Sequence, residues 1–184
     1  MKIEIYTDGS CSLNNVDNSE RECDGGFGYV VLVDGAPVYE YFDMYHSTTN
    51  NRMELRAIIH SLQYCLDTYG GSHEYVVYTD SAYISNCINQ KWYKTWMSNG
   101  WKTSKRTAVK NVDLWKQLIH MGGNWVANGG VQFTKVAGHK NVTYNNRADE
   151  LANMWRKSSS ENFNTDKESP SGSFERVSTN QWLF

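Results

Sequence analysis

Four carboxylates stand in four separate stretches of the sequence, and their residue type suits one kind of chemistry. They are Asp8 in YTDGSC, Glu54 in NNRMELRA, Asp80 in YTDSAY and Asp149 in NNRADELA. Two of them end runs that alternate like strands and two lie in helical patterns, so a fold could bring all four to one sheet edge. Ligands that are all oxygen favour Mg²⁺ or Mn²⁺ over zinc. The four acids therefore predict a divalent-cation site.

Each acid also has an ordinary structural explanation when it is taken alone. Asp8 could form a turn with the glycine and serine that follow it, and Asp80 could cap a helix. Glu54 would be stabilised near a helix N-terminus, and Asp149 could be a solvated surface charge. The tripeptide Tyr-Thr-Asp ends both strand patterns, at residues 6–8 and 78–80. Parallel neighbouring strands would bring these two aspartates together, which favours a shared site.

The elements that must position the acids follow from hydrophobic periodicity and turn residues. Strands are predicted at 2–8, 25–33, 37–45, 74–79 and 131–136, and helices at 50–69, 91–98, 108–120 and 143–157. Asp34-Gly35 is a hairpin signal between the second and third strands, and Gly70-Gly71 ends the first helix. A three-stranded meander followed by alternating helices and strands predicts a mixed α/β domain.

Composition limits the class of protein. A chain of 184 residues fits one domain plus a tail. Its net charge is −2, yet residues 91–116 contain seven positive side chains and one negative one, a local charge of +6 that predicts a polyanionic partner. The four cysteines have no zinc-like spacing, and neither an apolar signal segment nor a membrane span is evident. We expect a soluble, reduced, cytoplasmic protein that has no membrane partner.

The chain resembles the type 1 ribonucleases H over residues 1–157. The motifs in common occur in the family order: DGSC at 8–11, TTNNRMEL at 48–55, YTDS at 78–81, GWKT at 100–103, KNVDLW at 110–115, and a Gly-His whose His139 stands ten residues before Asp149. The resemblance implies a ribonuclease H-like fold with a five-stranded mixed sheet, strands 1–3 antiparallel and 4–5 parallel, and helices on both faces. Residues 91–116 match the family's basic protrusion.

The resemblance also implies an activity, namely endonucleolytic hydrolysis of the RNA strand of RNA–DNA hybrids that leaves 3′-hydroxyl and 5′-phosphate ends. Asp8, Glu54, Asp80 and Asp149 would hold two Mg²⁺ ions, with Mn²⁺ as an alternative, and His139 would assist proton transfer or product release. Cleaving a phosphodiester with two cations needs several carboxylates, so the residue types fit independently. The alternatives are a hybrid-binding module without catalysis and a DNA-directed nuclease of the same fold.

Substrate contacts are carried over from the same resemblance. The candidates are small polar groups that could sense a ribose or a phosphate, together with aromatic and cationic groups of the basic segment. They are Gly9, Ser10, Cys11, Thr49, Asn50, Asn51, Ser81, Trp92, Trp101, Lys102, Thr103 and Asn145. Asn50 could instead cap the helix that carries Glu54. For Trp96 and Trp115 we expect packing rather than substrate contact.

Three departures from the family pattern concern loops and the tail. An acidic excursion occupies about 14–26, Ser47 stands where relatives often have an arginine, and residues 158–184 have no counterpart. The polar composition of residues 158–184 predicts disorder. The tail ends with Trp182, Leu183 and Phe184, a cluster typical of docking. It resembles ligands of sliding clamps, so 180–184 could bind a clamp or another replication protein, consistent with a role in DNA replication.

Overall fold

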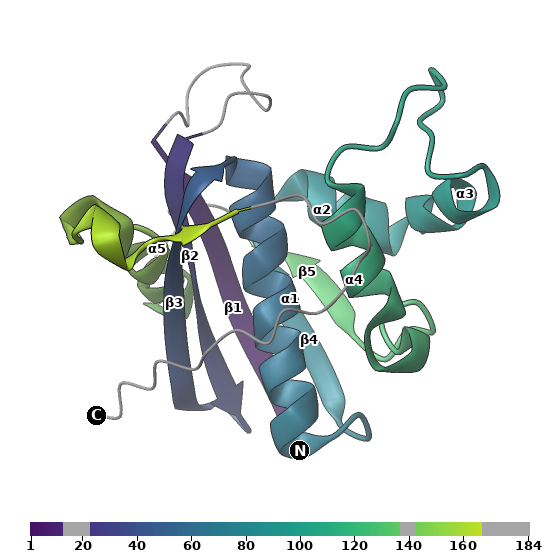
Figure 1. Ribbon diagram of the computed structural model, residues 1–184. Helices are drawn as coiled ribbons and strands as arrows, with labels where there is room; N and C mark the ends of the chain where they lie inside the picture. Colours follow the sequence, from purple (N-terminus) through teal and green to yellow (C-terminus); the bar gives the residue numbers. More distant parts are fainter. Residues whose placement is uncertain (13–22, 137–142, 167–184) are drawn as a thin grey trace.

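The computed structural model describes residues 1–12, 23–136 and 143–166. Among these residues the strands form one six-stranded sheet in the order β5-β4-β1-β2-β3-β6 (Figure 1). The strands are β1 (Lys2–Cys11), β2 (Cys23–Val33), β3 (Ala36–Thr48), β4 (Glu74–Thr79), β5 (Gln132–Lys135) and β6 (Asn164–Thr165). The mixed α/β class is confirmed, and the predicted count of five strands is one too few.

Strand directions follow the prediction. β1, β2 and β3 form an antiparallel meander. The turn between β2 and β3 uses Asp34 at φ 49° and Gly35 at φ 83°, the left-handed conformations that a two-residue hairpin turn requires. β4 runs parallel to β1, and β5 runs parallel to β4. The carboxyl ends of β1 and β4 therefore meet at the same end of the sheet.

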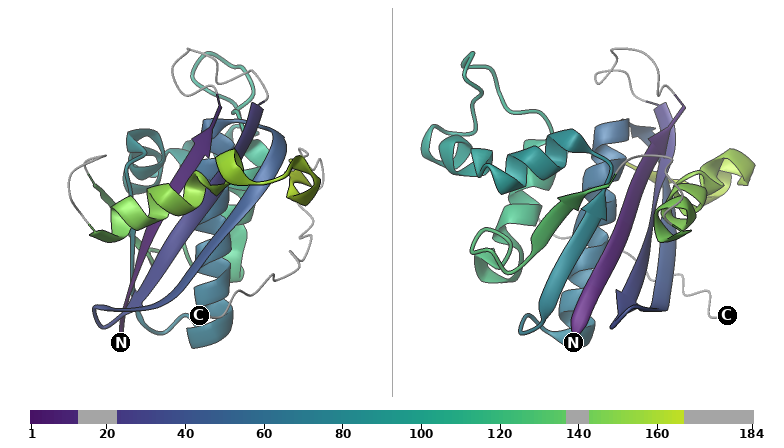
Figure 2. Two further views of the ribbon diagram at one scale, coloured as in Figure 1. Left: turned by 90° about the vertical axis from the view of Figure 1, so that its left-hand side faces the viewer. Right: turned by 180° about the vertical axis from the view of Figure 1, so that it is seen from behind.

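Helices cover both faces of this sheet, as predicted (Figure 2). On one face α1 packs on β1 and β2 and α4 packs against α1, and on the other face α5 packs on the same two strands. The helices are α1 (Asn50–Tyr69), α2 (Ala82–Asn89), α3 (Trp92–Ser98), α4 (Val112–Asn124), α5 (Thr143–Ala152) and the 3-10 turns η1 (Met154–Lys157) and η2 (Ser160–Asn162). The central strand pair is thus held between α1 and α5.

α1 begins and ends where local chemistry specifies it. Thr49 is its N-cap, because its side chain accepts a hydrogen bond from the backbone N–H of Arg52 at 3.3 Å. Gly70 ends the helix at φ 76°. Between these ends most of the apolar face is buried, and Leu55 and Leu62 are inaccessible to solvent. The cap is Thr49, so the interpretation of Asn50 as the cap is wrong.

Residues 158–166, called the C-terminal extension here, return across the molecule to β3. β6 pairs in parallel with the end of β3. The buried carboxylate of Asp166 accepts hydrogen bonds from Thr48 Oγ1 at 2.7 Å and Arg52 Nε at 2.8 Å. It also accepts a bond from Arg56 Nη2 at 2.6 Å. Arg52 makes a second ion pair with Asp113 of α4 at 2.8 Å. Ion pairs with Arg52 and Arg56 therefore attach the extension to the first part of α1.

The extension corrects one expectation. The prediction of disorder is wrong for residues 158–166, because a 3-10 turn and a two-residue strand lie there. Residues 167–184, including the apolar end at 180–184, lie outside the described residues, as does most of the acidic excursion at 14–26.

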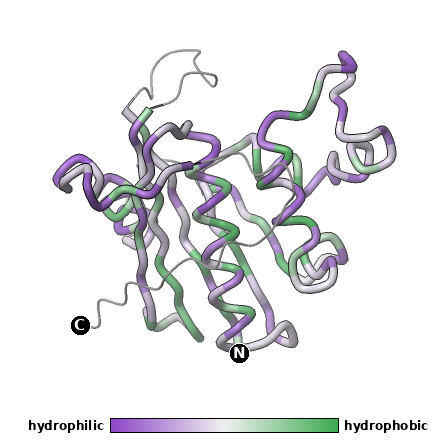
Figure 3. Tube along the Cα trace, in the orientation of Figure 1, coloured by the Kyte–Doolittle hydropathy of each residue, from purple (hydrophilic) through white to green (hydrophobic). Residues whose placement is uncertain are grey.

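Hydropathy follows the layers of the fold. Hydrophobic stretches gather along the strands and the inner side of α1, whereas the outlying loop between α3 and α4 is largely hydrophilic (Figure 3). In the part of the chain that is described, no helix combines the length and the apolar character that a membrane span needs.

Candidate metal and active site

Asp8 and Asp80 occupy equivalent positions on two neighbouring strands. Asp8 lies near the end of β1, and Asp80 follows the last residue of β4. In the parallel register Tyr6 pairs with Tyr78, and the two rings stack with their centroids 4.5 Å apart. Because each aspartate stands two residues beyond its tyrosine, both carboxylates lie at the same height on the same edge of the sheet.

Glu54 reaches this edge from α1, and a glycine makes that approach possible. A Cβ atom added to Gly9 would lie 2.3 Å from the backbone nitrogen of Glu54, which is far inside van der Waals contact. Only a residue without a side chain therefore lets α1 lie this close to β1. The DGS sequence does more than make a turn, since Gly9 is still part of β1.

The four acids converge on one pocket. One carboxylate oxygen from each of Asp8, Glu54 and Asp80 lies within 4.8 Å of the other two. Asp149 enters from α5, on the other face of the sheet, and lines the same pocket. The pocket has a volume of about 350 Å³, and its remaining lining residues are Gly9, Ser10, Asn50, Ser81 and Asn153.

Burial and, after it, the crowding of like charges raise the pKa values of Asp8 and Glu54. Burial, followed by the nearby carboxylates of Asp80 and Asp149, raises the pKa of Asp8 to about 8. Burial and then the charge of Asp8 raise the pKa of Glu54 well above its ordinary value. These acids are therefore costly to ionise together unless a positive charge lies among them.

The residues fit a divalent cation. Among the described residues the buried Oε2 atom of Glu54 has no hydrogen-bond partner, and a buried carboxylate oxygen without a partner needs a compensating group. The surrounding donors are carboxylate oxygens, the ligands that hard cations prefer. A cation among Asp8, Glu54 and Asp80 would satisfy this oxygen and remove the repulsion that raises the pKa values.

Comparison with known proteins decides the family. The family model described as RNase H matches residues 1–156. The chain belongs to the ribonuclease H family. Ribonuclease H of Clostridium botulinum strain Hall is 40% identical over 152 residues, which cover 83% of this chain and 93% of that protein. Ribonuclease H of Caldicellulosiruptor saccharolyticus is 41% identical over 82% of this chain and 93% of that protein.

Solved structures agree with this assignment. LC9-RNase H1, a type 1 ribonuclease H, superimposes with a TM-score of 0.64 at 30% identity, covering 82% of this chain and 70% of that one. LC11-RNase H1, solved with an RNA/DNA hybrid, superimposes with a TM-score of 0.57 at 22% identity over 83% of this chain and 94% of that one, which supports the fold.

Family membership confirms the expected activity class. The chain is a ribonuclease that hydrolyses the RNA strand of RNA–DNA hybrids, and the family depends on divalent metal. A two-metal mechanism is consistent with that family, and Asp8, Glu54 and Asp80 form a cluster of acids in this structure. The non-catalytic and DNA-directed alternatives are thereby set aside.

Eight of the expected substrate contacts belong to the part of the chain near the pocket, and four of them line it. Gly9, Ser10, Asn50 and Ser81 line it with the acids, although Ser81 also caps α2 by accepting a hydrogen bond from Ile84 N at 3.3 Å. The other four do not line it: Cys11, Thr49 and Asn145 are buried, and Asn51 is half-buried.

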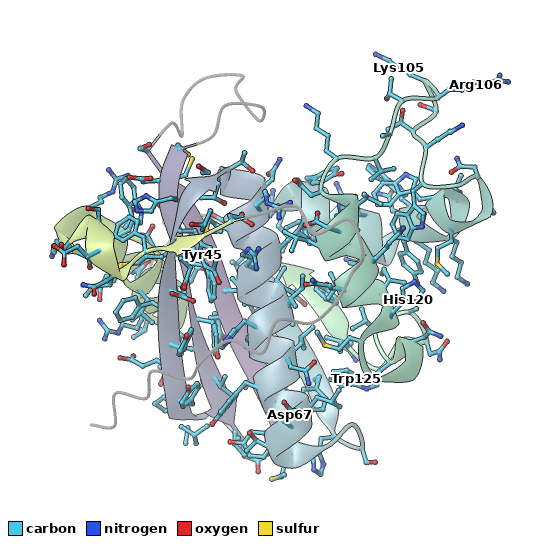
Figure 4. The ribbon with its side chains drawn as sticks, viewed as in Figure 1. Tyr45, Asp67, Lys105, Arg106, His120 and Trp125 are labelled. Carbon is cyan, nitrogen blue, oxygen red and sulfur yellow. The ribbon has the colours of Figure 1, made fainter. Side chains whose placement is uncertain are left out.

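The remaining expected contacts lie on the basic protrusion, residues 91–116. Trp92 is exposed at the start of α3, and Lys102 is exposed in the loop that follows, beside half-buried Trp101 and Thr103. At the outer end of this loop the labelled side chains of Lys105 and Arg106 point away from the sheet (Figure 4). The protrusion thus carries its charge away from the core.

Packing explains the inner tryptophans of the protrusion. Trp115 is fully buried, and its ring meets Trp96 edge to face with centroids 5.4 Å apart. The expectation that both pack rather than bind substrate agrees with this arrangement.

The histidines differ in environment. His139 lies outside the described residues. His60 belongs to α1, where its Nδ1 lies 2.9 Å from the hydroxyl of Tyr29 and its ring stacks on Tyr41. Burial lowers the pKa of His60 to about 4.

One pocket residue was missed by the sequence reasoning. Asn153 lines the pocket and donates a hydrogen bond to Asp149 Oδ1 at 3.0 Å. The available signal was its spacing, since a residue four positions after Asp149 lies on the same helical face.

Proposed function

We propose that Asp8, Glu54, Asp80 and Asp149 bind two Mg²⁺ ions and that this centre cuts the RNA strand of RNA–DNA hybrids, leaving 3′-hydroxyl and 5′-phosphate ends. The observation that carries the proposal is the Glu54 carboxylate, whose buried Oε2 lacks a hydrogen-bond partner among the described residues and one of whose oxygens lies within 4.8 Å of oxygens of Asp8 and Asp80. Oxygen ligands favour Mg²⁺, and Mn²⁺ would fit the same donors.

The acids have distinct parts in this proposal. Asp8 and Glu54 are the most buried, so they anchor the cations from β1 and α1, while the half-buried Asp80 and Asp149 lie nearer solvent and the substrate. When bound, a pair of cations supplies an activated water and stabilises the charge on the leaving oxygen. The carboxylates hold their orientation through the strands and helices that carry them, so little reorganisation accompanies reaction.

Recognition of the hybrid is assigned to two surfaces. Ser10, Asn50 and Ser81 line the pocket and could exchange hydrogen bonds with a 2′-hydroxyl, the group that distinguishes RNA from DNA. The other proposed contacts near the pocket are Gly9, Cys11, Thr49, Asn51 and Asn145, with His139 as the proton-transferring histidine. On the protrusion Trp92, Trp101, Lys102 and Thr103 would contact the DNA strand, and its lysines would pair with phosphates.

The wider setting is also part of this proposal. We assign residues 1–157 to the catalytic domain and place the protein in the cytoplasm, because its four cysteines are buried thiols, none of them in a disulfide among the described residues. Binding of a sliding clamp or another replication protein by residues 180–184 is tested separately. A chain lacking 180–184 should lose retention on clamp-coated beads and keep its cleavage rate, and unchanged retention would end that assignment.

The test of the cutting activity compares three duplexes of one sequence: an end-labelled RNA–DNA hybrid, double-stranded RNA and double-stranded DNA. With Mg²⁺ we expect cuts in the RNA strand of the hybrid alone, and with EDTA we expect none. Cleavage of the DNA duplex in preference to the hybrid would overturn the proposal.

A further inference from the structure

The side-chain amide of Asn153 joins the fourth acid to the pocket wall formed by β1. Asn153 directly follows α5, one helical turn after Asp149. Its Nδ2 donates hydrogen bonds to Asp149 Oδ1 at 3.0 Å and to the Asp149 carbonyl oxygen at 2.9 Å. Its Oδ1 accepts hydrogen bonds from Ser10 Oγ at 2.7 Å and from Arg156 Nε at 2.9 Å. One amide thus contacts residues from β1, α5 and η1.

The partners allow only one orientation of this amide. Both groups facing Nδ2 are oxygens of Asp149, and the Arg156 group facing Oδ1 is a donor that has no acceptor capacity. If the amide oxygen and nitrogen were exchanged, the oxygen would face two oxygens of Asp149 and the NH₂ group would face the Arg156 N–H. Three of the four contacts would then be acceptor to acceptor or donor to donor. The bond from Asn153 to the Asp149 carboxylate is therefore a donated N–H bond, and the serine hydroxyl donates its proton to Asn153.

This arrangement matters because Asp149 is one of the two acids that lie only half-buried at the pocket. It is half-buried on α5, whereas Asp8 and Glu54 are buried in the interior of the site. The charges of the other acids repel its carboxylate. A hydrogen bond to an ionised group is stronger than a neutral one, so the Asn153 amide can hold the carboxylate in the pocket against that repulsion. Asp149 Oδ2 is then left to face a cation.

The same amide sets the role of Ser10. Because Ser10 Oγ donates its only proton to Asn153, it can offer lone pairs to a donor that enters the pocket. A ribose 2′-hydroxyl is such a donor, and a deoxyribose has none. Trp155 Nε1 lies 3.4 Å from the same oxygen, which is a long contact that leaves acceptor capacity free.

We propose that Asn153 is a positioning residue that orients the Asp149 carboxylate for cation binding and, through the same amide, the Ser10 hydroxyl for the ribose. This inference rests on the proposed function, because it takes Asp149 to be a cation ligand. Groups that orient metal ligands in this way change metal affinity or activity by about 10–100-fold when they are removed.

The test is a double-mutant cycle in the full chain with Asn153→Ala, Asp149→Asn and the combined variant. The first readout is Mn²⁺ binding to the metal-free protein, measured by titration calorimetry without substrate. We expect Asn153→Ala to weaken binding about 10-fold in the parent chain and by less than twofold in the Asp149→Asn background, because Asn153 acts through that carboxylate.

Cleavage kinetics supply the second readout. For Asn153→Ala we expect much of the lost rate to return at saturating Mg²⁺, while the KM for the hybrid stays raised because Ser10 is no longer oriented. Trp155→Phe is the matched control: it removes the other contact to Ser10 without touching Asp149, so its Mn²⁺ affinity should remain within twofold of the parent.

The outcomes separate the two proposals. If Asp149→Asn leaves Mn²⁺ binding unchanged, Asp149 is no ligand and the proposed metal centre fails. If Asp149→Asn weakens binding but Asn153→Ala does not, or if the two losses add fully, the positioning role is wrong. Should Asn153→Ala unfold, Asn153→Ser keeps a polar group but cannot span both partners, and the same expectations apply to it.

Discussion

Removing the charge of Asp166 should detach the C-terminal extension from α1. Its side chain is completely inaccessible and pairs with Arg52 and Arg56, whose side chains are 6% and 21% exposed. Asp166→Asn keeps the shape but leaves two arginines facing a neutral amide. Losing one partner of a buried ion pair costs about 3–5 kcal/mol. The lower end applies here, because Arg52 keeps its pair with Asp113 and Arg56 can reach water.

The pKa of Asp166 gives a second route to the same magnitude. Its hydrogen bonds with Arg52 and Arg56 outweigh the opposing effect of burial and lower the pKa from 3.8 to about 2. At about 1.4 kcal/mol per pH unit, this shift corresponds to about 2 kcal/mol of folding stability. The two routes together predict a loss of about 2–3 kcal/mol, or roughly 5–10 °C in the unfolding midpoint for a chain of this size.

The assay is urea and thermal unfolding of Asp166→Asn beside Glu161→Gln, which neutralises an exposed acid of the same extension. The control should stay within about 0.5 kcal/mol of the parent. Since the folded pKa of Asp166 is depressed, its contribution is fully present above about pH 4 and is lost as the pH falls through 2. The gap between parent and Asp166→Asn should close over that range. Equal unfolding free energies for Asp166→Asn and Glu161→Gln at pH 6 would refute this account of the extension.

Three further predictions concern the site and the protrusion. Gly9→Ala should cut the cleavage rate at least 10-fold, because its Cβ would lie 2.3 Å from Glu54 N; a rate within twofold of the parent would contradict the close approach. Without metal, the raised pKa of Asp8 means that the folded state holds a proton which the unfolded state has released, so stability should fall as the pH rises from about 4 to 8. Because the raised pKa of Glu54 adds a slope of the same sign, Asp8→Asn should reduce this slope and stabilise the metal-free protein at pH 8 by roughly 2–5 kcal/mol in urea unfolding, and an unchanged slope would argue against the crowded acids. Trp92→Ala should raise the KM for the hybrid with little change in the unfolding midpoint, whereas Trp115→Ala should lower the free energy of unfolding by about 3–5 kcal/mol; the reverse pattern would exchange their roles.

Local signals in the sequence were enough for the elements that carry the acids. α1 runs over the predicted residues 50–69 because a threonine cap, a periodic apolar face and a terminal glycine all act within one segment. The repeated Tyr-Thr-Asp predicted that Asp8 and Asp80 would stand side by side, since parallel strands in register need only matching positions. These features depend on neighbours in the sequence or on one strand pairing, so the sequence pattern is enough to predict them.

Features that depend on distant partners were not predictable in this way. β6 has two polar residues and no apolar pattern, and the ion pair of Asp166 with Arg52 joins positions 114 residues apart. The role of Asn153 likewise depends on Ser10, which is 143 residues away. No local composition shows that a polar segment will meet a buried arginine, so the composition of residues 158–166 predicts disorder where the structure has an ordered extension.

The most direct measurement of the central claim is single-turnover cleavage of an end-labelled RNA–DNA hybrid by the parent chain and by Asp8→Asn, each with Mg²⁺, beside hybrid binding measured in EDTA. The account predicts RNA fragments with 3′-hydroxyl and 5′-phosphate ends from the parent. It predicts a rate at least 1,000-fold lower for Asp8→Asn, on the order of 4 kcal/mol of lost transition-state stabilisation, with hybrid affinity within about threefold of the parent. An Asp8→Asn variant that cuts the hybrid at the parent rate would contradict the assignment of this acid cluster as the cutting centre.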